Sequence, residues 1–195
     1  MTASAKQSLC DPRLWSADEF LDFLSSRPDG ERWQLVDGLA MMMVPPSKVH
    51  QRIAGNLERL LNETLRVTRP DLFAYREIGV RVPGVPNFSP EPDVVVLSAD
   101  ATYTYYDEQF YFVAEVISPS NTAEMIERKL ELYRSHPDNL YCLTIDQDSV
   151  HVALYARENG WARMSLRSLN DALVLPAFAF AASLAALYEG TPPAR

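Results

Sequence analysis

The sequence offers little material for a disulfide framework, a membrane span or a secretory signal. It has only two cysteines, Cys10 and Cys142, which form no metal-binding spacing and are not expected to pair in a reducing compartment. No apolar run approaches the ~20 residues that a membrane-spanning helix needs. The first residues, MTASAKQSLC, also lack the apolar core of a signal peptide. We therefore expect a cytoplasmic protein with no membrane partner.

Positive charge is also scarce. The chain has 18 lysines and arginines against 26 aspartates and glutamates, which gives a formal net charge of −8. Proteins that coat nucleic acid nonspecifically are normally basic, so this balance argues against that class. It remains compatible with an enzyme that has a local basic groove. Clustered carboxylates can themselves hold cations.

The length of 195 residues and the apolar content of 47% fit a single domain over residues 1–195, with a core at about 15–188 and short tails. Capping signals and hydrophobic periodicity predict an α/β fold around a mixed sheet. The expected elements are a helix capped by Ser16, a hairpin over 33–46 that turns at Asp37-Gly38, a helix capped by Ser47, strands over 72–82, 93–97 and 110–117, a helix from Ser120 to about 135, strands over 140–146 and 150–157, and a closing helix over 178–190.

One acidic residue interrupts the most apolar strand. Glu115 lies within FYFVAEVI, residues 110–117, and a buried carboxylate normally becomes neutral, pairs with a cation or binds a metal. Asp93 opens the preceding predicted strand, DVVVL. If these strands are neighbours, the two carboxylates converge at one edge of the sheet. A hard divalent cation relieves the repulsion between them.

A lysine on the next predicted helix is the third candidate. Lys129 borders the apolar stripe formed by Ile126, Leu130 and Tyr133. We therefore expect it to lean over the sheet near Glu115. There a lysine can orient a metal-bound water or stabilise charge on a phosphoryl group.

The ordered set PDVVVL, AEVISPSN and a helical lysine followed by LELY resembles the PD-(D/E)XK nuclease superfamily. More narrowly, the chain resembles the Uma-two family of bacterial restriction endonucleases. The segments WQLVDGLAMMMVPPSKVHQRIAGNLERLL and YCLTIDQDSVHVALYAR extend the likeness over most of residues 15–188. The resemblance implies a restriction-endonuclease-like mixed sheet flanked by helices. It also implies a magnesium-dependent endonuclease acting on DNA, with manganese able to substitute.

The same resemblance assigns roles to residues. Asp93 and Glu115 would ligate the metal, with the backbone carbonyl of Val116 as an extra ligand. The superfamily places its lysine two residues after the acid, where this chain has Ile117, so the lysine function would move to Lys129, as in the Uma-two pattern. Cleavage of two strands by one small domain would favour a homodimer.

The hairpin departs from the family pattern E-L-I-D-G-E, because Gln34 and Leu39 stand where the family has glutamates. If either glutamate serves the site, a second ion would bind weakly or activity would be impaired, unless Glu91 compensates. This departure and the acidic net charge support an alternative function. In that alternative, the chain is a catalytically degenerate nuclease-fold protein that acts as a binding or assembly module.

Each candidate residue also has a structural interpretation. Glu115 can form a buried ion pair with Arg76 or Arg81, and Lys129 can be a solvated helix residue. His50 can contact a phosphate, or it can only cap or pack its helix. Four basic residues near or on that helix can contact phosphates or simply face water: Lys48, Arg52, Arg59 and Arg66.

Overall fold

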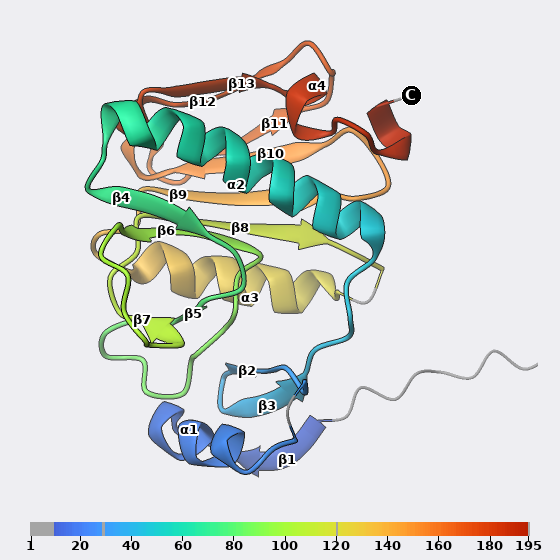
Figure 1. Cartoon of the computed structure of the whole chain (residues 1–195). Helices are drawn as coiled ribbons and strands as arrows, with labels where there is room; N and C mark the ends of the chain where they lie inside the picture. Colours follow the sequence, from blue (N-terminus) through green and yellow to red (C-terminus); the bar gives the residue numbers. More distant parts are fainter. Residues whose placement is uncertain (1–9, 29, 120, 195) are drawn as a thin grey trace, which may run out of the picture.

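A six-stranded mixed sheet lies at the centre of the computed structural model, which describes residues 10–28, 30–119 and 121–194 (Figure 1). Its strand order is β11-β10-β9-β8-β6-β4. Only β8 and β9 are parallel to each other, and every other neighbouring pair in this sheet is antiparallel. These strands are β4 (Leu72–Tyr75), β6 (Val94–Ser98), β8 (Phe112–Ile117), β9 (Tyr141–Asp146), β10 (Val152–Ala156) and β11 (Arg163–Leu166).

Helices cover both faces of this sheet, with α2 (Lys48–Thr68) on one side and α3 (Ala123–Ser135) on the other (Figure 1). The two faces of β8 show how the sequence creates these layers, because successive strand residues point to opposite sides. Phe112, Ala114 and Val116 belong to the core beneath α2, whereas Val113 belongs to the core beneath α3. The same alternation places Glu115 on the α3 side. This interior position fixes which helix can supply its partners.

The N-terminal segment forms a smaller sheet, ordered β1-β3-β2, together with one helix. Its elements are β1 (Cys10–Leu14), α1 (Ala17–Ser25), β2 (Trp33–Val36) and β3 (Leu39–Met42). The capping box of Ser16 and Glu19 is confirmed. So is the hairpin turn, in which Asp37 and Gly38 both have positive φ, as a tight two-residue turn requires. Paired backbone hydrogen bonds between Leu35 and Ser89 attach this unit to the loop that leads to β6.

The C-terminal segment differs from the predicted closing helix. Residues Phe180–Ser183 form β13, which pairs antiparallel with β12 (Ala172–Leu175), and only Leu184–Leu187 form a helix, α4. The side chain of Phe180 is buried while that of Ala181 is exposed, which is the alternation of a strand. The alanine-rich composition suggested a helix, but pairing with β12 determined the structure.

Two further boundaries differ from the sequence prediction. The strand expected over 72–82 breaks after β4 and resumes as β5 (Gly79–Val80), which pairs with β7 (Tyr106–Asp107). Between them Glu77 adopts φ 60°, which a continuous strand cannot contain. Helix α3 begins at Ala123 with Thr122 as its N-cap, and Ser120, at which the sequence predicts the helix to begin, lies outside the described residues. Within the described part, no helix is long and apolar enough to cross a membrane.

The packing of α3 on the sheet can be tested through Cys142 of β9. This thiol is fully buried beneath α3, and burial raises its pKa to about 12. Since the thiolate is the reactive form, we expect Cys142 in a Cys10→Ser variant to be inert toward an aromatic disulfide reagent at pH 8 and to react fully in denaturant. Rapid reaction of the native protein would show that α3 does not seal this face.

Candidate active site

Asp93 and Glu115 meet at one end of the central sheet. The antiparallel pairing of β6 with β8 aligns Val94 with Ala114. Continued by one residue, this register sets Asp93 opposite Glu115, on the same face. The two strands are therefore neighbours, as the convergence of the two carboxylates requires. The carboxylates meet at the edge at which β6 begins and β8 ends (Figure 1).

Asp93 is held by donors from two directions. The backbone N–H of Val116 donates to its Oδ2 over 2.6 Å, and Nε2 of His50 lies 2.8 Å from its Oδ1. His50 reaches this carboxylate from the first turn of α2, where its own backbone N–H donates to the capping hydroxyl of Ser47. The imidazole of His50 therefore contacts Asp93, and only the backbone of His50 takes part in capping the helix. Both oxygens of Asp93 have a fixed orientation as a result.

Glu115 is almost completely buried and has two partners from α3. Its Oε1 lies 2.5 Å from Nζ of Lys129 and accepts a hydrogen bond of 2.7 Å from the hydroxyl of Tyr133. Burial raises the pKa of Glu115, the charge of Asp93 adds to this rise, and the ammonium of Lys129 opposes it. The second oxygen, Oε2, makes no hydrogen bond to any residue within 10–28, 30–119 or 121–194. It is the oxygen that remains available to a further cation.

The environment of Lys129 rules out the solvated interpretation, because only 3% of the residue is exposed. The proposed arginine partners of Glu115 are also engaged elsewhere. Arg76 forms an ion pair with Glu58, at 2.8 Å. Arg81 contacts Asp18 at 3.2 Å.

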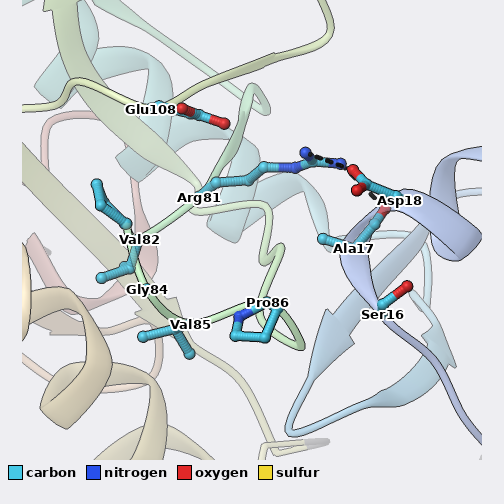
Figure 2. Close-up of a pocket in the computed structure, with 10 residues that line it drawn as sticks. Ser16, Ala17, Asp18, Arg81, Val82, Gly84, Val85, Pro86 and Glu108 are labelled. Carbon is cyan, nitrogen blue, oxygen red and sulfur yellow. Dashed lines mark hydrogen bonds and ion pairs between the residues drawn. The ribbon is translucent and has the colours of Figure 1, made fainter.

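Figure 2 shows the guanidinium of Arg81 directed at Asp18, at the rim of a cavity of about 470 Å³. The cavity lies between the start of α1 and the loop over residues 81–86. None of Asp93, Glu115 and Lys129 lines it. This cavity is therefore separate from the acidic site. Arg81 lines the cavity and does not contact Glu115.

A second group of charges borders Asp93. Arg32, directly before β2, forms ion pairs with Glu91 and, at 2.8 Å, with Glu77. Burial raises the pKa of Glu91, the positive charge of Arg32 opposes this, and the negative charges of Glu77 and Asp93 add to it. Glu91 thus points into the structure, a point that the sequence left open. Its immediate partner is an arginine.

The two hairpin departures have different surroundings. Gln34 lies in β2, and its side-chain Oε1 is buried without a hydrogen-bond partner in the described part of the chain. Leu39 begins β3, is half-buried and pairs across the hairpin with Val36. Neither position supplies a carboxylate to the site. The acids that surround Asp93 come instead from the segments before β5 and β6.

The chemistry of the donors fits a hard divalent ion. Among the described residues there is no cluster of three or more histidine, cysteine or acidic side chains that would hold a metal unaided. Mg²⁺ commonly binds through one or two protein carboxylates and keeps several waters. Asp93 and Glu115 match that mode of binding, and the backbone N–H of Val116 already contacts Asp93. The site does not match a structural zinc site, which is built from histidine and cysteine.

Some participants could not be identified from the sequence. The sequence places Tyr133 only in the apolar stripe of α3, although its position four residues after Lys129 puts both on one helix face. Arg32 and Glu77 gave no local signal, because their contacts join segments far apart in the chain. Their pairing depends on how the N-terminal hairpin docks against the sheet.

The comparisons with known proteins agree with this architecture. The family model Uma2, described as "Putative restriction endonuclease", matches residues 17–186. The chain belongs to the Uma2 family. This confirms the family resemblance drawn from Asp93, Glu115 and Lys129 in their sequence context.

Among solved structures, the chain resembles one described as "a putative nuclease belonging to DUF820" from Anabaena variabilis ATCC 29413. The TM-score is 0.71 at 16% identity, over 89% of this chain and 97% of that chain. At this identity the likeness shows a shared fold, which confirms the expected α/β architecture for this Uma2 member. No curated protein matches the sequence.

The partner set of Glu115 leads to a stability prediction. Replacing Tyr133 by Phe removes the hydroxyl that donates to Glu115 and keeps the ring in place. Because hydrogen bonds to charged groups contribute more than neutral ones, we expect a loss of about 1.5–3 kcal/mol in unfolding free energy, measured by urea denaturation. Tyr103→Phe, which alters a fully exposed tyrosine, is the matched control and should not change stability. Equal stability of the two variants would contradict the importance of this bond.

Proposed function

We propose that this chain is a cytoplasmic, single-domain endonuclease that hydrolyses DNA phosphodiester bonds with Mg²⁺, for which Mn²⁺ can substitute. The observation that carries this proposal is the convergence of three side chains from separate elements. Asp93 precedes β6, Glu115 lies in β8 and Lys129 lies in α3, yet Glu115 and Lys129 are in direct contact and Asp93 is paired to the same strand end. Family membership supports a nuclease of restriction-endonuclease type.

Asp93 and Glu115 would hold the ion between them. One oxygen of Glu115 is already bound to Lys129 and Tyr133, so Oε2 is the oxygen that would bind the ion. When bound, the metal activates a water and neutralises charge on the phosphoryl group. Asp93 stays in place because Val116 and His50 fix both of its oxygens. Such supporting contacts keep a metal ligand in its binding orientation before the ion arrives.

Lys129 would act on the attacking water and on the phosphoryl oxygens. Its ammonium lies against Glu115 in a nearly dry environment, where a fixed charge stabilises a developing negative charge more strongly than in water. Glu115 positions the ammonium, so the acid would have two tasks, holding the ion and orienting the lysine. The catalytic lysine would thus lie on helix α3, rather than on strand β8 where the superfamily pattern places it.

DNA would approach the end of the sheet where α2 begins. Of the four basic residues considered from the sequence, Lys48 and Arg52 lie in the first turns of α2, close to His50. Arg59 pairs with Glu63 farther along the helix, and Arg66 lies beyond it. Lys48 and Arg52 are therefore the proposed phosphate contacts. Cleavage of both strands would need a homodimer, with one such site on each copy.

The cleavage test uses supercoiled plasmid and magnesium. Lys129→Met retains the aliphatic volume and removes the charge, so we expect cleavage to fall by about 10²–10³-fold. Glu115→Gln should fall at least as far, since it removes a metal ligand. Glu158→Gln changes an exposed carboxyl and is the control. Circular dichroism must first show each variant folded, because breaking a buried pair can cost about 3–5 kcal/mol. Full activity of folded Lys129→Met would contradict the assignment.

The degenerate binding module remains the competing function, and the absence of hairpin glutamates favours it. It predicts that the wild-type protein binds its partner but shows no metal-dependent cleavage. It also predicts that Lys129→Met leaves partner binding unchanged. Those two results together would replace the enzymatic proposal.

A further inference from the structure

Arg32 occupies a cation position beside the proposed metal site. Its guanidinium bridges two carboxylates, those of Glu77 and Glu91, through different nitrogen atoms. The contacts span more than 40 positions of sequence, from the N-terminal hairpin to the segments that precede β5 and β6. A bridge between two acids is the arrangement by which a metal ion is often held, but here the cation belongs to the chain.

This bridge adjoins Asp93 directly. Glu91 and Asp93 are separated only by Pro92, and a residue before proline is biased away from the helical conformation. Burial raises the pKa of Glu91, and the negative charge of Asp93 is close enough to contribute to that rise. The acid pair of Arg32 and the acid pair of the metal site therefore form a continuous row, with Glu91 next to Asp93.

The carboxylate of Glu77 is held in place by several contacts. Its backbone has φ 60°, a left-handed conformation that is unfavourable for a residue with a side chain. Its Oε1 receives a second hydrogen bond, at 3.1 Å, from Nε2 of Gln51. The amide oxygen of Gln51 accepts in turn from Arg76, at 2.9 Å. Contacts from α2 and from Arg32 thus hold a strained residue with its carboxylate at this point.

The charges of the row balance for one divalent ion. Four carboxylates, those of Glu77, Glu91, Asp93 and Glu115, face two basic side chains, those of Arg32 and Lys129. Counted formally, the four negative charges exceed the two positive charges by two. One Mg²⁺ neutralises this excess, and a second divalent ion would find no free acid pair.

We propose that Arg32 is a built-in cation that takes the place of a second metal ion, so that the site binds a single divalent ion. This inference rests on the proposed function, because it concerns the metal count of that same site. Arginine stays charged under all physiological conditions and cannot exchange with solvent ions. The second cation of the site would therefore be permanent, whatever the magnesium concentration.

The test counts bound Mn²⁺ on the full chain, by the resonance signal of free Mn²⁺ and by calorimetry. We expect one ion per chain for the wild type, one for Arg32→Lys, which keeps the charge, and two for Arg32→Gln, which frees Glu77 and Glu91. Adding Glu77→Gln to Arg32→Gln should return the count to one. This double variant locates the additional ion at the acid pair.

The outcomes separate this inference from the function on which it rests. Two ions in the wild type, or one ion in folded Arg32→Gln, would overturn the role of Arg32 and leave the proposed nuclease site standing. No ion in the wild type would overturn both. If Arg32→Gln does not fold, Glu77→Gln alone decides the matter. It should bind one ion, as the wild type does, and loss of that ion would show that Glu77 is a metal ligand and contradict the proposal.

Discussion

The buried pair of Glu115 and Lys129 is the contact on which the rest of the site depends. It joins the central strand β8 to helix α3 at the point where the sheet ends, and Tyr133 completes it from the next turn of the helix. Removing two charges from water is costly, and a buried ion pair is often no more stabilising than apolar side chains of the same size. Its retention in the core beneath α3 is therefore better explained by chemistry at the sheet edge than by stability.

Each carboxylate around the site has a defined partner. Glu115 is paired with an ammonium in the interior, and Asp93 is fixed by a backbone N–H and an imidazole at the edge. Glu91 shares the guanidinium of Arg32 with Glu77. Because Arg32 already bridges these two acids, Asp93 and Glu115 are the two carboxylates assigned to the ion, which links the fold of three segments to one proposed chemistry.

The sequence predicted the centre of this arrangement because the signals there are local. A glutamate within an apolar strand and a lysine beside an apolar helical stripe are visible without a structure, and both acquire their positions from strand alternation and helix periodicity. The contacts of Arg32 and Glu77 could not be predicted, since they depend on docking of the N-terminal hairpin. The error at residues 178–190 has the same origin. Alanine and leucine favour a helix locally, but pairing of β13 with β12 overrides that preference.

The central claim, that Glu115 is buried because it binds a metal, is tested most directly by calorimetric titration with Mg²⁺. The wild-type protein and the Glu115→Gln variant should be compared under identical conditions. The account predicts saturable binding to the wild type and no measurable binding to the variant, because the amide cannot replace the anionic ligand. Equal binding by the two proteins would show that the ion site does not include Glu115. Binding by neither, even with DNA present to complete the coordination, would contradict the metal site altogether.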